Sequence, residues 1–83
     1  MPFEDAEASH LQDILDSIEA IERFVLGMSL ESFARDEKTQ AAVERKMLII
    51  SEAAIRLREK AETLCPDVPW RDIRGIGNWL RHQ

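Results

Sequence analysis

Residues 9–26 carry apolar side chains at steps of three and four positions, the spacing that gathers them on one face of a helix. Ser9 is placed to cap the start of this helix, and Gly27 is placed to end it in a left-handed conformation. Residues 28–35 then predict a short turn or helix. Leu30 and Phe33 of this segment are expected to pack inward. The apolar positions of the first helix, residues 9–26, are Leu11, Ile14, Leu15, Ile18, Ile21 and Val25.

The strongest pattern lies between residues 37 and 64, where apolar residues alternate steps of four and three without interruption. Such a heptad seam is typical of antiparallel helical bundles. Asp36 is placed to cap the start, and the Cys65-Pro66 pair ends the pattern. We therefore predict one continuous helix, roughly 40 Å long at about 1.5 Å per residue. The seam consists of Val43, Met47, Ile50, Ala54, Leu57, Ala61 and Leu64, and Ala42, Ile49 and Ala53 widen it.

A third helix is predicted over residues 70–82, and Pro69 is suited to its first turn. Gly75 and Gly77 lie inside this helix, where each costs about 1 kcal/mol relative to Ala. We expect a close helix approach or a function to account for this cost. The residues predicted to face inward are Ile73, Ile76 and Leu80.

These elements predict an all-α fold, an antiparallel up-and-down helical bundle that residues 1–83 form as a single domain. The low numbers of Gly and Pro, 3 each, and the absence of Tyr also favour helix over sheet. Three helices leave the long second helix partly uncovered, so we expect a fourth helix or the surface of a second copy to complete the core. On this reasoning the domain is C-terminally incomplete and the protein is a homodimer.

The formal net charge of −5 argues against a protein that coats nucleic acid with its whole surface. The charge is uneven, because residues 69–83 carry Arg71, Arg74 and Arg81 against the single acid Asp72. This segment has a balance of +2, which leaves −7 for the rest of the chain. A local basic patch on an acidic body fits a confined anionic ligand or a particular RNA, although solvated helix faces carry arginines just as readily.

Candidate metal ligands are few, because Cys65 is the only thiol and His10 and His82 are the only imidazoles. We expect no metal and no cofactor, and a partly buried, structural Cys65. The acidic N-terminus has neither the basic region nor the apolar run of a signal peptide, and no stretch approaches membrane-spanning length. The expected location is the cytoplasm, without a membrane partner.

Five polar side chains share roughly a 100° arc of the third helix on a helical wheel. Arginine binds phosphate oxygens and stabilises charge developing at phosphorus, and histidine exchanges protons near neutral pH. Asparagine orients the imidazole or holds a phosphate oxygen. In RNA the 2′-hydroxyl is an internal nucleophile, so this set needs no metal; an ordinary solvated polar face has the same pattern. The five residues are Arg71, Arg74, Asn78, Arg81 and His82.

Other candidates for chemistry have simpler interpretations. Trp70 and Trp79 have the flat shape that stacks on nucleobases, but such residues more often anchor a core or an interface. The charged residues 36–38 are interpreted as a helix start rather than a catalytic acid pair, and residues 44–46 as a solvated helix face.

Two long blocks of the sequence resemble the HepT-like family, a branch of the HEPN (higher eukaryotes and prokaryotes nucleotide-binding) superfamily. Residues 36–46 and 48–54 resemble the family's second-helix signature, and residues 69–82 resemble the signature before and within its third helix. The resemblance implies a four-helix up-and-down bundle that works as a homodimer, with the two motif helices facing each other across a cleft. The last helix would then follow Gln83.

The resemblance further implies a metal-independent ribonuclease toxin, encoded beside a minimal nucleotidyltransferase antitoxin that transfers AMP to a Tyr just after the motif. Asn78 and His82 match the motif, but Gly77 stands where the family most often has Arg. On this hypothesis His82 is the general acid–base and Asn78 orients it. The remaining roles go to arginines: Arg74 or Arg81 stabilises the transition state, and Arg71, Arg74 and Arg81 bind RNA.

Two other hypotheses use the same residues. In the first, the basic arc belongs to a non-catalytic module that binds RNA, a nucleotide or the nucleotidyltransferase partner, and Gly77 reflects a lost activity. In the second, the chain is a helical dimerisation fragment with a purely structural role.

Overall fold

The computed structural model describes residues 5–81 of the chain. All regular structure in this part of the chain is helical, without a strand, which confirms the all-α prediction. The molecule is elongated, with principal extents of 42 × 26 × 21 Å. None of the helices within residues 5–81 has the length and apolar character needed to cross a membrane. The predicted fourth helix would lie outside the described residues.

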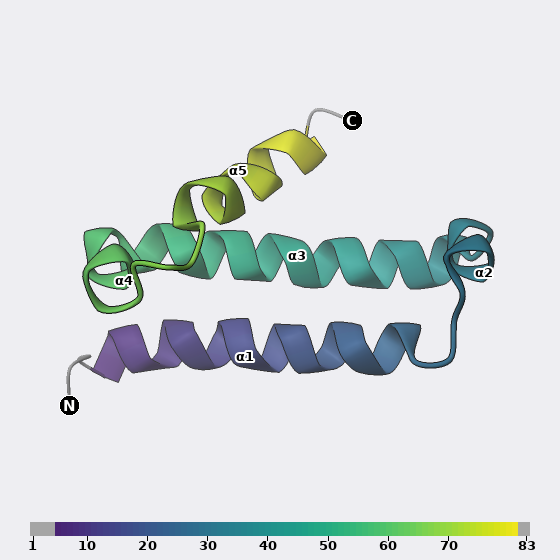
Figure 1. The fold of residues 1–83 in the computed structure, drawn as a ribbon, viewed down its shortest axis with the longest axis horizontal. Helices are drawn as coiled ribbons and strands as arrows, with labels where there is room; N and C mark the ends of the chain where they lie inside the picture. The colour runs from purple at the N-terminus through teal and green to yellow at the C-terminus, as the bar shows by residue number, and fades with distance from the viewer. Residues whose placement is uncertain (1–4, 82–83) are drawn as a thin grey trace.

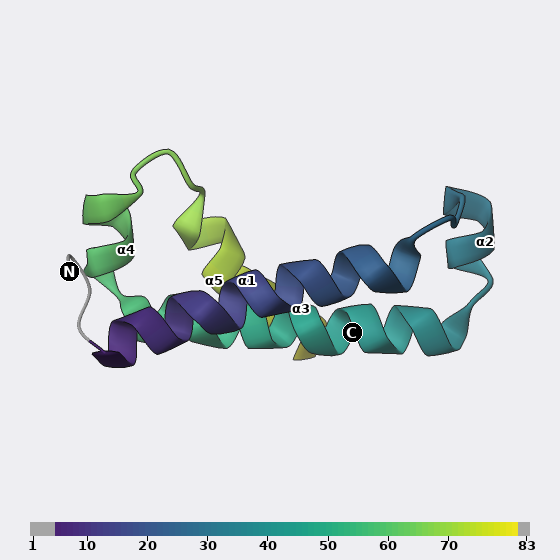
Figure 2. The ribbon, with the colours of Figure 1, turned by 90° about the horizontal axis from the view of Figure 1, so that it is seen from below.

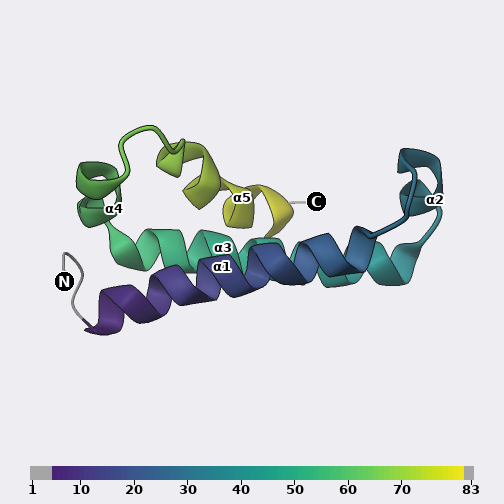
Figure 3. The same cartoon turned by 60° about the horizontal axis from the view of Figure 1, so that its bottom comes forward.

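Two long helices, α1 (Asp5–Val25) and α3 (Glu37–Leu57), lie side by side and run antiparallel (Figures 1 and 2). The short α2 (Leu30–Ala34) lies at the turn between them. At the other end of α3, α4 (Glu59–Leu64) turns back towards α5 (Trp70–Arg81), which packs on α3 at an angle (Figure 3). Helix α3 is therefore the central element, since both α1 and α5 pack against it.

Helix α1 begins at Asp5, so the prediction that Ser9 caps it is wrong, and Ser9 lies inside the helix. The acidic residues of the first turn, Asp5 and Glu7, stabilise this earlier start through the helix dipole. Gly27 has a φ of 79°, which confirms the left-handed end of the helix. The apolar stripe of α1 is wider than the face that α3 covers, because Leu15 and Ile18 remain exposed.

A capping box that was not predicted from the residue pattern stabilises the start of α2. The Ser29 hydroxyl accepts a hydrogen bond from the Ser32 N–H, and the Ser32 hydroxyl accepts one from the Ser29 N–H, each at 3.0 Å. Phe33 is half-buried as predicted, but Leu30 is 85% exposed, so its predicted packing is wrong. A helix of five residues is too short to turn more than one large side chain towards the protein, and in α2 this side chain is Phe33.

The predicted continuous helix over residues 37–64 is broken at Arg58, which has a φ of 54° and a ψ of −147°. The predicted cap at its start is confirmed, since Asp36 accepts hydrogen bonds from the N–H and the hydroxyl of Thr39. These two bonds lower the pKa of the Asp36 carboxyl. The break turns α4 away from the axis of α3 and allows the chain to return along α3 as α5 (Figure 1).

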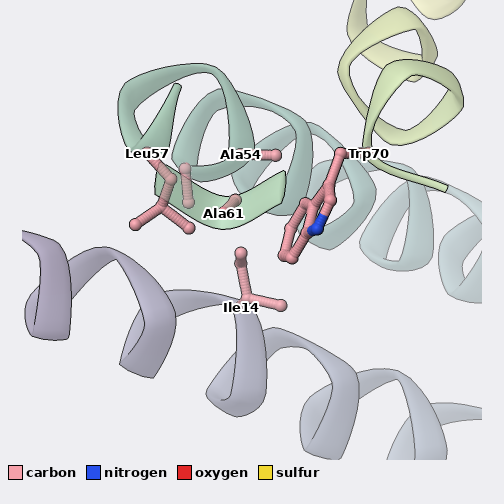
Figure 4. Packing of buried hydrophobic residues seen from close by; sticks show 6 residues of the cluster. Ile14, Ala54, Leu57, Ala61 and Trp70 are labelled. Carbon is pink, nitrogen blue, oxygen red and sulfur yellow. The ribbon is translucent and has the colours of Figure 1, made fainter. Parts of the chain in front are cut away.

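The core lies where α1, α3, α4 and the start of α5 meet, close to this break (Figure 4). Leu57 is 2% exposed, and the indole of Trp70 reaches into the same cluster from α5. Most of the predicted heptad seam is confirmed as buried or half-buried, although its residue Ala61 belongs to α4 and not to a continuous α3. The buried cluster comprises Ile14, Ala53, Ala54, Leu57, Ala61 and Trp70.

Gly75 offers a test of the fold on its own, because a Cβ added there would meet nothing within 4 Å. We expect Gly75→Ala to stabilise the protein by about 0.5–1 kcal/mol, since Ala loses less backbone entropy in a helix. Urea unfolding followed by circular dichroism measures this change. A loss of stability would contradict the open environment of Gly75.

Candidate functional site on α5

The first residue of α5 attaches the helix to the core. Trp70 is 5% exposed, and its indole Nε1 donates a hydrogen bond of 2.9 Å to the carbonyl oxygen of Cys65. Trp70 is thus a core anchor, which confirms the simpler of its two interpretations. Cys65 is half-buried, as predicted, and is a free thiol.

The middle of α5 is attached to α3 through Ser51, a 1% exposed residue. The Ser51 hydroxyl donates to the Arg74 carbonyl at 2.9 Å and accepts from the Gly77 N–H at 3.2 Å. A Cβ at Gly77 would lie 3.0 Å from the Ser51 Oγ and 3.5 Å from the Leu48 Cδ2. Gly77 therefore permits a close helix approach, as predicted, whereas Gly75 faces open space. The predicted burial of Ile73, Ile76 and Leu80 is only partial.

The Arg74 guanidinium is engaged at the C-terminal end of α3. Its Nε donates to the Ala54 carbonyl at 3.1 Å and one Nη donates to the Arg58 carbonyl at 2.6 Å. The other Nη forms an ion pair with Glu62 of α4. These carbonyls lie at the helix end and the break, where the regular α-helical pattern stops, so Arg74 acts as a side-chain cap. The residue pattern did not predict this role, because it depends on the break at Arg58.

The exposed part of the predicted arc is consequently narrower than the helical wheel suggested. Arg71 and Asn78 are exposed on α5, whereas Arg74 turns towards α3 and α4. Arg81 ends α5, but only its backbone is described, and His82 lies outside the described residues. The structure thus shows which arginine is engaged elsewhere, and the catalytic roles of these residues stay predictions.

An open depression of about 380 Å³ lies along α5 and includes Met47 of α3, and Trp79 at its edge is 63% exposed. No group of three His, Cys, Asp or Glu side chains within residues 5–81 is placed to hold a metal ion. The depression is lined by Met47, Arg71, Asp72, Gly75, Ile76 and Trp79.

Comparison with known families shows which family the chain belongs to. A family model described as ribonuclease HepT-like matches residues 14–83, which include all of α5. The chain belongs to the HepT-like ribonuclease family.

Three relatives illustrate this membership. The "Probable ribonuclease HepT" of Thermococcus cleftensis is 38% identical over 73 residues, which are 88% of this chain and 66% of that protein. A candidate RNase of Methanocaldococcus jannaschii is 37% identical over 82 residues, which are 99% of this chain and 67% of that protein. A candidate RNase of Caldanaerobacter subterraneus is 32% identical over 74 residues, which are 89% of this chain and 66% of that protein. This HepT-like chain thus spans about two thirds of its relatives' length, and no solved structure matches it significantly.

The Ser51–Gly77 contact bears on the arginine that the family resemblance implies at position 77. We expect Gly77→Arg alone to destabilise the chain by about 1–3 kcal/mol, because a side chain there overpacks the contact with Ser51. The double variant Ser51→Ala/Gly77→Arg removes the Oγ that lies 3.0 Å away and is expected to recover part of this loss. Thermal unfolding of both variants, with Ser51→Ala as the control, measures the coupling. Additive effects of the two substitutions would contradict the steric explanation.

Proposed function

We propose that this HepT-like protein is a metal-independent ribonuclease whose reacting groups lie at the end of α5. The observation that carries the proposal is the family match, which runs through the whole α5 motif to residue 83. The relatives' names, which describe ribonucleases, support the same activity. In addition, hydrogen bonds of Trp70, Ser51 and Arg74 attach α5 to the rest of the fold, and Asn78 is exposed on this helix.

The proposed reaction is attack of the RNA 2′-oxygen on the adjacent phosphorus. The new bond joins the 2′-oxygen to phosphorus, the bond from phosphorus to the 5′-oxygen breaks, and the products carry a 2′,3′-cyclic phosphate and a 5′-hydroxyl. His82 accepts the proton of the 2′-hydroxyl, and the His82 of a second copy, in its protonated form, donates one to the leaving 5′-oxygen. Asn78 orients the imidazole or a phosphate oxygen.

The contacts of Arg74 guide our choice of the arginine that stabilises the transition state. Because Arg74 caps α3 and pairs with Glu62, we propose that Arg81 stabilises the negative charge of the transition state. Arg81 is next to His82 in the sequence. Arg71, which is exposed, supports RNA binding. We also propose that the protein works as a cytoplasmic homodimer and that a minimal nucleotidyltransferase antitoxin is its partner.

A specific observation favours a second candidate, a non-catalytic module that binds RNA or the nucleotidyltransferase. Gly77 lacks the side chain that the motif usually supplies, and the Arg74 guanidinium is already engaged. Both features reduce the number of cations available for catalysis at the α5 surface.

A cleavage assay separates the two candidates. We expect the wild-type protein to cut single-stranded RNA in the presence of EDTA and to leave cyclic phosphate ends, which polynucleotide kinase treatment and gel mobility reveal. The same RNA with 2′-O-methyl groups should stay intact, because it lacks the nucleophile. Binding of RNA or of the nucleotidyltransferase without any cleavage would overturn the ribonuclease and leave the binding module.

A further inference from the structure

Trp79 is the large aromatic residue that the proposed chemistry does not use. Its side chain is 63% exposed, whereas the other tryptophan, Trp70, is 5% exposed and hydrogen-bonded in the core. Exposure of a tryptophan leaves a large apolar surface in water, which is unfavourable unless a ligand or partner covers it. Most of the Trp79 side chain is therefore open to contact by a ligand or a partner.

The face of α5 next to Trp79 is built to admit a flat ligand. Arg71, Gly75 and Trp79 follow one another at four-residue steps and therefore share one face of the helix. Gly75 lies between the other two, and a Cβ there would meet nothing within 4 Å. The absent side chain leaves the space between the guanidinium and the indole open, and Met47 and Ile76 add apolar surface to the depression of about 380 Å³.

The charges of the depression select the class of ligand. No carboxylate among residues 5–81 forms an ion pair with Arg71, so its guanidinium is available for a phosphate. Asp72 is the one acid in the lining, and a carboxylate accepts hydrogen bonds from the exocyclic amino group of cytosine or adenine. An anion-binding group and an aromatic surface, separated by a bare helix face, match a phosphate and its base.

We propose that Arg71, Gly75 and Trp79 form a nucleotide subsite for single-stranded RNA. One base stacks on the Trp79 indole, and a neighbouring phosphate binds the Arg71 guanidinium. This subsite deepens the proposed function and rests on it, since it holds the RNA on the same helix as the cleavage motif. A second copy of the chain is the other occupant that such a surface admits, and the test below distinguishes the two.

The test measures binding of a fluorescently labelled 2′-O-methyl oligocytidylate by anisotropy, and quenching of tryptophan emission by the unlabelled oligonucleotide. This probe cannot be cut, so binding is read independently of catalysis. We expect Trp79→Ala to weaken binding by about ten- to a hundredfold, the usual loss for one stacked base. Trp79→Phe should keep most of the affinity but lose the quenching, because only the buried Trp70 then emits.

Gly75→Leu is expected to fold and to block the subsite, since a Cβ at this position meets nothing within 4 Å and the rest of the side chain would extend into the depression. It should weaken binding as much as Trp79→Ala, with an unfolding temperature no lower than that of the wild type. Leu30→Ala is the matched control, because Leu30 is an even more exposed apolar residue at the α2 end of the molecule and its removal should leave binding unchanged.

Three results would overturn the subsite: unchanged binding by Trp79→Ala, an equal loss in Leu30→Ala, or dissociation of a dimer by Trp79→Ala with unaltered affinity for the oligonucleotide. Failure of the ribonuclease proposal looks different. If ordinary RNA is never cleaved while the stacking variants still lose affinity, the subsite stands and the protein is a binding module.

Discussion

Replacing His82 with Ala is expected to lower the single-turnover rate of RNA cleavage by about a hundred- to ten-thousandfold, the usual contribution of a general acid–base. The 2′-hydroxyl must lose a proton as it attacks, and His82 is the imidazole within the matched motif. The rate should be measured in EDTA with saturating protein, so that weaker binding does not contribute.

His10→Ala is the control for this prediction, because His10 is the other imidazole of the chain and lies on α1. It should leave the cleavage rate within about twofold of the wild type, as expected for a substitution away from the reacting atoms. Equal losses in the two variants, or no loss in His82→Ala, would rule out His82 as the acid–base.

Replacing Arg74 with Met is expected to lower the free energy of unfolding by about 2–4 kcal/mol, since hydrogen bonds to a charged group contribute about 1.5–3 kcal/mol each and are not fully additive. Met keeps much of the apolar stem but leaves the carbonyls of Ala54 and Arg58 without the guanidinium. Urea unfolding, with the slope compared between variants, measures the change.

Glu62→Gln separates the ion pair from the capping. The Glu62 side chain is 53% exposed, so losing its charge should lower the free energy of unfolding by under about 1 kcal/mol.

If Arg74→Met leaves stability unchanged but abolishes cleavage per folded molecule, Arg74 is catalytic after all and the capping role is wrong. If it mainly destabilises, the assignment of catalysis to Arg81 is supported.

The amphipathic patterns were sufficient to predict the long helices and most of their buried positions. Steps of three and four residues place side chains on one face whatever the helix packs against, so α1 and α5 were predicted with small errors at their ends, and α3 was predicted correctly up to the break at Arg58. The caps at Asp36 and Gly27 are equally local, since each depends on a few neighbouring residues.

The errors share a physical cause. Residues 37–64 have no proline or glycine, so nothing local announces the break at Arg58. It depends on α5 returning to the end of α3, where Arg74 caps the carbonyls and Trp70 fills the core. In the same way the helical wheel placed Arg74 among the exposed polar residues, because a wheel carries no information about neighbouring elements.

The sequence by itself determined the helical class, the family and the candidate residues Asn78 and His82, because all three depend on residue order alone. Only the tertiary structure decided that Gly77 lies against Ser51, that Arg74 is a cap and that Trp79 is open to solvent beside Gly75. These are long-range contacts, or the lack of them, and they arise only when segments distant in sequence pack together.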